Sequence, residues 1–245
     1  MKKYDLIIGF GCSFMEGGGL DNQIIHMRMH GLETPISLNE TEEFRYKNNF
    51  IAYLAELYNC EYINFAESRC PNDLIFENIY KYFNNNASDK KILLVGQISL
   101  FNRIYAYYEP IEKFVKVSAL RWEDHPFNSE PKMKELYDYF ERYVKYIYNE
   151  DMEYRKTLRN VETYTAWLTQ KNIDCLWLSY EGRPEQFAES KNFIKFDGDN
   201  LGAYVEKNKL RLKDDPNLKT DDLHMTIDAH RLVAEKIYKH LNTNL

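Results

Sequence analysis

The sequence predicts an α/β fold in which a mostly parallel, five-stranded sheet lies between two layers of helices. Short apolar runs alternate along the chain with segments of helical periodicity, and strands that alternate with helices pair in parallel. Two of the runs, at residues 4–9 and 91–96, end in glycine. The chain has 245 residues, which is long enough for one such domain with a full core.

Five segments are expected to be strands because each is a short, mostly apolar run. They are residues 4–9, 61–66, 91–96, 173–180 and 192–196, the last being the shortest.

Helices are expected where apolar residues recur every three or four positions. They are residues 48–59, 73–84, 132–149, 152–170 and 226–242. The sequence places Asn72 or Asp73 at the start of the second of these as its cap. Met133, Leu136, Phe140, Val144 and Ile147 form the apolar stripe of the third.

The remaining segments organise the chain as one domain, residues 1–245. Residues 16–47 are mostly polar and are expected to be a long loop, and residues 104–131 show no clear period. The stretch 103–170 is too long for a simple crossover between strands. We therefore expect it to be a helical insertion on the same core.

Composition excludes several classes of function. The net charge is −6 without a basic block, which argues against binding to nucleic acid. No apolar run is long enough for a membrane helix, and the N-terminal residues do not form a signal peptide. The four cysteines show no paired spacing, so reduced thiols in a cytoplasmic protein are expected. Oligomeric state has no signature in the sequence.

A glycine-rich bend follows the first expected strand and carries a serine, in the sequence Gly9-Phe10-Gly11-Cys12-Ser13. A dinucleotide fingerprint needs a third glycine where this chain has Phe14, and no G-K-[ST] of a phosphate-binding loop is present. The alternative is that the bend presents Ser13 as a nucleophile, which requires a base and a group that orients the base.

His224 is the candidate base. It lies just before the last expected helix, and Asp221 stands three residues upstream, where its carboxylate can turn back to the imidazole. Asp222 is the alternative to Asp221, because the two residues are adjacent and the sequence does not determine the conformation of the loop. Thr226 is the natural cap of the helix that follows.

These two ends of the chain together resemble the SGNH/GDSL hydrolase family. The first family motif, G-D-S-x-T-x-G, is matched by Gly11, Ser13 and Gly17, with Cys12 in place of the aspartate. The closing D-x-x-H motif is matched by Asp221 and His224. The resemblance implies a flavodoxin-like sheet, a serine esterase mechanism without a metal or cofactor, and a small-molecule or glycan ester as substrate. Divergent members of this kind are frequent among phage-encoded proteins, which would allow association with a virion.

The family's oxyanion donors are matched less well. Backbone N–H groups of Ser13 and of Arg69 are implied as donors, although the family has glycine where this chain has Arg69. The family's G-x-N-D motif places an asparagine where this chain has Ile98, so that Gln97, Ser99 or Asn102 would have to supply the third donor. Losing one such donor typically costs about 2.7–4 kcal/mol of transition-state stabilisation.

Two other functions stay open at this stage. The incomplete oxyanion motifs are compatible with a non-catalytic binding or structural protein of the same fold. A metal site built from His224, His230 and either Asp221 or Asp222 is the second alternative, although the spacing of the two histidines is not a standard ligand spacing.

Overall fold

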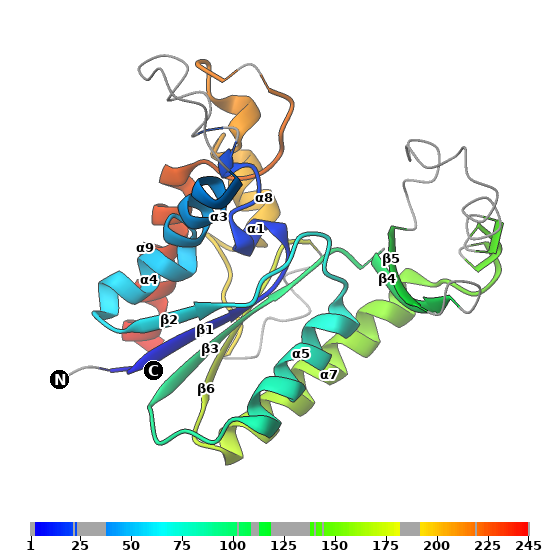
Figure 1. The fold of residues 1–245 in the computed structure, drawn as a ribbon, viewed down its shortest axis with the longest axis horizontal. Coiled ribbons are helices and arrows are strands. Elements are labelled where there is room, and N and C mark those ends of the chain that lie inside the picture. Colours follow the sequence, from blue (N-terminus) through cyan, green and yellow to red (C-terminus); the bar gives the residue numbers. More distant parts are fainter. Residues whose placement is uncertain are drawn as a thin grey trace.

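The structure is a computed structural model, and its helices and strands are shown in Figure 1. It describes residues 3–21, 23, 38–101, 103–108, 113–118, 138–139, 141–143, 145–181, 192–218 and 220–244.

A parallel sheet of four strands runs through the centre of the described chain (Figure 1). Its order is β2 (Glu61–Asn64), β1 (Leu6–Phe10), β3 (Ile92–Ile98) and β6 (Asp174–Ser179). Leu6 lies opposite Glu61 on one side and Ile92 on the other, which sets the register. This order matches the first four strands of flavodoxin-like folds, in which sites form beyond the carboxyl ends of the strands.

Helices cover both faces of this sheet, as the sequence predicted (Figure 1). On one face α4 (Phe50–Tyr58) packs against α9 (Ile227–Asn244), where the rings of Tyr58 and Tyr238 are 4.8 Å apart. On the other face lie α5 (Asn72–Asn85) and α7 (Glu150–Gln170). Phe76 of α5 packs 5.6 Å from the ring of Trp177 on β6, whose indole N–H donates to Thr165 of α7 at 2.8 Å. The three-layer α/β/α architecture is confirmed.

Burial on both faces explains why the strands read as continuous apolar runs. Every residue of β1 and β3 is buried, as expected for parallel strands between two helical layers. Gly96 on β3 is required by this packing, since a Cβ there would lie 2.3 Å from the Trp177 ring.

The fifth strand expected at residues 192–196 is not formed. Trp177 donates its N–H to the Asn192 carbonyl at 2.7 Å and accepts from Ile194 N–H at 2.9 Å. This makes a single parallel bridge to Phe193, and the chain then turns at Phe196, which bridges to Asp199. The segment therefore touches the edge of β6 without extending the sheet.

The insertion is not purely helical, which corrects a second expectation. Residues 103–118, expected to be irregular or helical, contain an antiparallel pair, β4 (Arg103–Tyr108) and β5 (Lys113–Ser118), with Arg103 opposite Ser118. Residues 119–131 lie outside the described residues. Within the expected helix 132–149, the described residues 138–139, 141–143 and 145–146 are helical.

The apolar stripe expected for helix 132–149 is contradicted at its end. Ile147 lies in a turn with 66% of its surface exposed. The side chains of Met133, Leu136, Phe140 and Val144 lie outside the described residues.

The long loop expected at residues 16–47 is also partly wrong. Residues 13–16 form the short helix α1 (Ser13–Glu16), and α3 (Leu38–Lys47) is a helix of ten residues. Residue 22 and residues 24–37 lie outside the described residues. Near the C-terminus, α8 (Leu201–Lys207) and the 3-10 turn η3 (Leu212–Asp214) complete the fold.

Helix caps agree with the sequence at one site and not at another. Thr226 caps α9, because its hydroxyl accepts the N–H of Ala229 at 3.2 Å. The cap of α5 is Pro71 instead of Asn72 or Asp73. The Asn72 side chain instead accepts the Ser99 N–H at 2.7 Å, so it joins α5 to the end of β3.

Two further observations concern the state of the cysteines and the character of the helices. All four cysteines are free thiols. Among the described helices, none has the length and apolar character that crossing a bilayer requires.

Candidate active site

Ser13 begins the helix that follows β1. Cys12 precedes it in an extended conformation, and the Cys12 carbonyl accepts the N–H groups of Met15 and Glu16 at 2.9 and 3.0 Å. Gly17 then ends the helix in the left-handed conformation at φ 90°, which glycine adopts without strain. The result is a tight strand–turn–helix unit in which Ser13 keeps 4% of its surface exposed.

His224 from the other end of the chain lies against this turn. A Cβ on Gly18 would be 3.0 Å from His224 Nε2 and 3.0 Å from the carbonyl oxygen of Ser13. The Ser13 carbonyl and the imidazole nitrogen are therefore no further apart than twice that distance. The run Gly17-Gly18-Gly19 thus has a structural role that the sequence did not reveal, because it lets the backbone approach the histidine.

The carboxylate on the His224 ring belongs to Asp222, not to Asp221. Asp222 Oδ1 lies 2.6 Å from His224 Nδ1 and also accepts the backbone N–H of His224 at 2.9 Å. Asp221, the first choice of the sequence analysis, is exposed. The alternative that the sequence left open between the two is thereby decided in favour of Asp222 as the partner of the imidazole.

This pairing fixes the tautomer of His224. A carboxylate at Nδ1 holds the proton there and leaves Nε2 as an acceptor. The edge of the imidazole formed by Cδ2 and Nε2 lies beside Gly18, because a Cβ there would be 3.0 Å from each of these atoms. A serine nucleophile requires a base close to its hydroxyl, and His224 lies beside the segment that follows Ser13.

The loop that carries the pair is braced by η3. Leu212 N–H donates to the His224 carbonyl at 2.8 Å, and Lys213 N–H donates to the Asp222 carbonyl at 2.9 Å. Arg211 forms a bridge with Met225 beside them. These bonds hold the backbone on both sides of the imidazole.

Aromatic rings form a second contact of the imidazole, and sequence reasoning missed it. The Phe14 ring lies 4.8 Å from the His224 ring and stacks at 3.6 Å on Tyr180, which follows β6. Burial raises the pKa of Tyr180 to about 12, against the opposing effect of Arg211. Tyr180 is thus a neutral phenol beside the buried guanidinium of Arg211.

The loop after β2 brings Arg69 to the serine turn. Glu67 N–H donates to the Gly11 carbonyl at 3.1 Å, and Cys70 N–H donates to the Glu67 carbonyl at 3.1 Å. Arg69, inside this turn, has φ 59°, a conformation that favours glycine. The backbone at Arg69 therefore has the left-handed geometry that glycine adopts without strain, although the residue is arginine.

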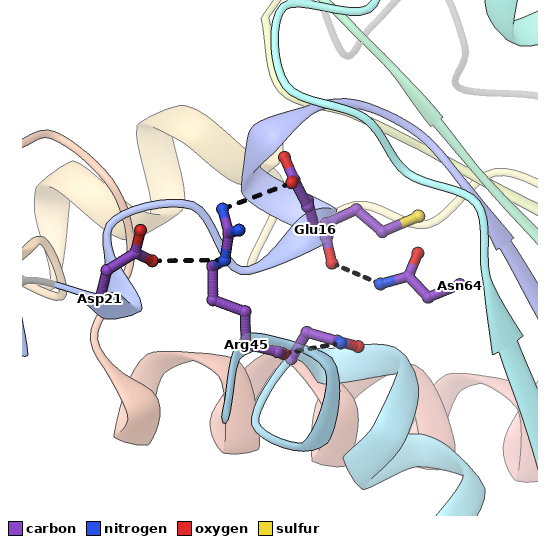
Figure 2. Close-up of polar contacts among 6 residues, drawn as sticks. Glu16, Asp21, Arg45 and Asn64 are labelled. Carbon is purple, nitrogen blue, oxygen red and sulfur yellow. Dashed lines mark hydrogen bonds and ion pairs between the residues drawn. The ribbon is translucent and has the colours of Figure 1, made fainter. Parts of the chain in front are cut away.

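Asn64 joins the same loop to α1. Its side-chain amide donates to the Met15 carbonyl at 3.0 Å and accepts the Ala66 N–H at 3.1 Å, as Figure 2 shows for the first of these bonds. The end of β2 and the end of α1 are therefore held together.

Gln97 is the described side chain that best fits the third donor. It is fully buried, and its Oε1 accepts the N–H of Cys12 at 3.3 Å and faces the Cys12 thiol at 3.6 Å. Because the Cys12 N–H needs an acceptor, this bond fixes the orientation of the amide. The Gln97 Nε2 group has no hydrogen-bond partner among the described residues, so a donor is left over beside the serine turn.

The other candidates for the third donor are less available. The Ser99 hydroxyl accepts from Arg103 at 2.7 Å, and its N–H is taken by Asn72. Ile98 is buried where the family has its asparagine, and Asn102 lies outside the described residues.

His230, part of the metal alternative, is occupied elsewhere. Its Nδ1 accepts the Phe50 N–H at 3.2 Å, and burial, together with the nearby His224, lowers its pKa to about 3. Among the residues that the structure describes, no three histidine, cysteine or acidic side chains are grouped as metal ligands would be.

Comparison with known proteins adds a likeness of shape. No family model matches the sequence, and no curated protein matches it. A solved structure from Desulfitobacterium hafniense DCB-2, assigned to the lipolytic G-D-S-L family, is 10% identical, with a TM-score of 0.36 over 96% of this chain and 99% of that one. A member of the same family from Veillonella parvula DSM 2008 is 12% identical, with a TM-score of 0.37 over 97% and 98%. The assignment of the fold and of the site is therefore based on the geometry of this chain.

Proposed function

We propose that the protein is a serine hydrolase of carboxylic esters, in which Ser13, His224 and Asp222 act together. The observation that carries this proposal is the Asp222–His224 pair, at 2.6 Å, on an imidazole that lies beside Gly18, in the segment that follows Ser13. A nucleophile, a base and a group that orients the base are the parts such chemistry needs.

In this mechanism Ser13 Oγ attacks the ester carbonyl while His224 Nε2 takes the hydroxyl proton. The proton then passes to the leaving alcohol, and an acyl group stays bound to Ser13. Water, activated by the same imidazole, releases the acid and restores the serine. Asp222 holds the imidazole in its tautomer and stabilises the imidazolium that forms.

Negative charge on the carbonyl oxygen would be met by three donors. The backbone N–H groups of Ser13 and Arg69 are two of them, and the free Nε2 group of Gln97 is the third, with Ser99 as the remaining alternative. Donors placed in advance stabilise the oxyanion more than solvent does. In this proposal, Gln97 takes over the task of the asparagine that Ile98 replaces.

The substrate class we propose is a small acyl ester, such as an acetyl group on a carbohydrate. Two observations favour a short acyl chain. Ser13 has little exposed surface, and Phe14 and Tyr180 fill the space beside the imidazole.

Kinetics on short-chain p-nitrophenyl esters test the proposal. Ser13→Ala and His224→Ala should abolish turnover, and Asp222→Asn should lower kcat by roughly 10⁴-fold, the loss seen when a triad histidine is left in the wrong tautomer. Asp221→Asn is the matched control, since it removes the neighbouring carboxylate, which is exposed, and should leave kcat near the wild-type value. Full turnover by Ser13→Ala would contradict the assignment.

A non-catalytic protein of the same fold is the second candidate, favoured by one observation. Ile98 is buried at the position of the family's asparagine, so this donor is absent there. A folded wild-type protein that turns over no ester and reacts with no fluorophosphonate would support that candidate.

A further inference from the structure

The side chain of Phe14, which follows Ser13 on α1, lies between two other rings. Its centroid is 4.8 Å from that of the His224 imidazole, with 36° between the planes, and 3.6 Å from that of the Tyr180 ring, with 21° between the planes. A ring stacked at 3.6 Å leaves no room for a second ring on the same face, so the imidazole lies against the other face of Phe14. The three rings therefore form one stack, which joins the helix of Ser13, the loop of His224 and the segment after β6.

The surroundings of Tyr180 keep this stack in place. Phe14 and Tyr180 are both buried, with 7% of their surface exposed. Tyr180 donates its N–H to the Ile98 carbonyl at 3.1 Å and accepts the N–H of Gly202 at 2.9 Å, so its backbone is bonded to β3 and to α8. A Cβ on Gly202 would also lie 3.2 Å from Cζ of the phenol. Because the ring behind it is fixed, Phe14 cannot move away from the imidazole.

The face of a phenylalanine ring favours the charged form of a neighbouring imidazole. The ring quadrupole attracts a cation whose distance from the centroid is within about 6 Å. In the proposed mechanism His224 becomes a cation only when it takes the proton of the Ser13 hydroxyl, so the attraction is stronger in the transition state than in the free enzyme. An interaction of that kind accelerates the reaction. Solvent weakens it little, because Phe14 is buried and the His224 side chain is 28% exposed.

Other charges near the imidazole act at different positions. Asp222 lies 2.6 Å from Nδ1, at the edge of the ring, and favours the imidazolium from there. His230 of α9 is neutral, because burial lowers its pKa to about 3. Arg211 of η3 is positive, and its charge is offset by Glu206 at 3.3 Å. Phe14 therefore acts on the face of the imidazole, where these groups do not.

We propose that Phe14 is a positioning residue, whose ring holds the imidazole of His224 against the helix of Ser13 and stabilises the imidazolium that forms during the reaction. This inference rests on the proposed function, since it assigns a role within that same site. It also gives a reason for the aromatic residue that directly follows the nucleophile in the sequence.

Fluorinated phenylalanines incorporated at position 14 test the proposal. Fluorine withdraws electron density from the face of the ring and nearly retains its shape, so the attraction for a cation weakens while the packing stays. We expect kcat/KM on a short-chain ester to fall stepwise through the monofluorinated, trifluorinated and pentafluorinated rings. The last should lie roughly 3- to 30-fold below the wild type. Phe14→Leu, which keeps an apolar side chain without an aromatic face, should fall at least as far.

The pH profile of kcat/KM separates this role from a merely structural one. A fluorinated ring favours the imidazolium less, so the imidazole is free to act as a base down to a lower pH. The midpoint of the acid limb should therefore move to lower pH along the series, while the plateau above it falls. A ring that only fills space would leave the midpoint where it is in the wild type.

Pentafluorophenylalanine in place of Phe83 is the matched control. Phe83 on α5 is 3% exposed and packs 5.0 Å from the ring of Tyr82, so the same substitution there tests the general effect of a fluorinated ring in the core. It should leave kcat/KM and the midpoint unchanged. Thermal unfolding of each variant shows that the kinetics were measured on folded protein.

The outcomes separate this inference from the hydrolase itself. A folded series at position 14 with constant kcat/KM would overturn the role of Phe14, and so would a loss of kcat/KM without a shift of the midpoint. Either result, together with an inactive Ser13→Ala variant, would leave the proposed hydrolase intact. Turnover by Ser13→Ala, or none by the wild type, would reject the hydrolase and with it the role of Phe14.

Discussion

Gly19→Ala is predicted to disable the site by pushing on the Asp222–His224 pair. A Cβ at residue 19 would lie 2.6 Å from Leu212 Cδ1, 2.7 Å from Asp222 Oδ2 and 2.9 Å from His224 Cβ, whereas ordinary contact begins at 3.4 Å. The carboxylate would therefore have to retreat by about 0.7 Å. Gly19 also has φ 81°, so alanine there adds backbone strain of about 1–2 kcal/mol.

The expected loss of activity follows from that displacement. A misplacement of about 1 Å in a catalytic arrangement costs on the order of 100-fold in rate. We therefore expect kcat/KM on a short-chain ester, and the rate of fluorophosphonate labelling, to fall by roughly 10- to 100-fold in Gly19→Ala. Both rates should be measured well below the unfolding temperature of the variant.

Gly198→Ala provides the matched control for strain. Gly198 has φ 90° and nothing within 4 Å of a Cβ, so the same substitution there adds backbone strain without a steric contact. Both variants should lose stability to a similar degree from strain, but Gly198→Ala should keep its kcat/KM. Equal activity of the two variants would refute the reasoning that the glycine run exists to admit the Asp222–His224 pair.

Three further predictions concern the core, the buried histidine and the third donor. Gly96→Ala should destabilise the protein by about 1–3 kcal/mol or more, because a Cβ would lie 2.3 Å from the Trp177 ring; an unchanged urea midpoint would contradict that packing. Burial lowers the pKa of His230 from 6.5 to about 3. The neutral imidazole therefore stabilises the folded protein above pH 6.5. This contribution to the free energy of unfolding is lost as the pH falls toward 3, at up to about 1.4 kcal/mol per pH unit. In urea unfolding across that range, His230→Gln, which keeps an acceptor for the Phe50 N–H, should lose less stability than the wild type; parallel losses would show that His230 is not the titrating group. Gln97→Met should lower kcat on a short-chain ester by roughly 100- to 1000-fold with KM little changed, and a wild-type kcat would remove Gln97 from the oxyanion donors.

The central sheet could be predicted from the sequence because local pattern and tertiary environment agree there. β1, β3 and β6 are buried by helices on both faces, and such strands are continuous apolar runs. The segment 192–196 has the same local character, but whether it pairs over one residue or five depends on the turn at Phe196. That turn is a tertiary outcome and leaves no periodicity in the sequence.

The insertion and α3 were missed for a different reason. β4 and β5 together hold three tyrosines and two valines, which favour strands, but they lack the continuous apolar run that identifies a buried parallel strand. α3 is mostly polar and is held through Arg45, which pairs with Glu16 and Asp21. Partners so far apart in the sequence cannot be inferred from one segment.

At the candidate site, the sequence indicated the residue types better than their geometry. Ser13 and His224 were found from motifs at opposite ends of the chain, and the structure brings their segments together. The choice between Asp221 and Asp222 depended on the loop, which η3 fixes by bonding the backbone on each side of His224. The roles of Phe14, Tyr180 and the glycine run follow only from contacts in three dimensions.

The central claim is that Ser13 is a nucleophile activated by the Asp222–His224 pair, and covalent labelling tests it most directly. Wild-type protein treated with a fluorophosphonate should gain one adduct, mapped by peptide mass spectrometry to Ser13, and Asp222→Asn should label far more slowly than Asp221→Asn. A folded wild-type protein that gains no adduct, or an adduct that persists in Ser13→Ala, would contradict the claim.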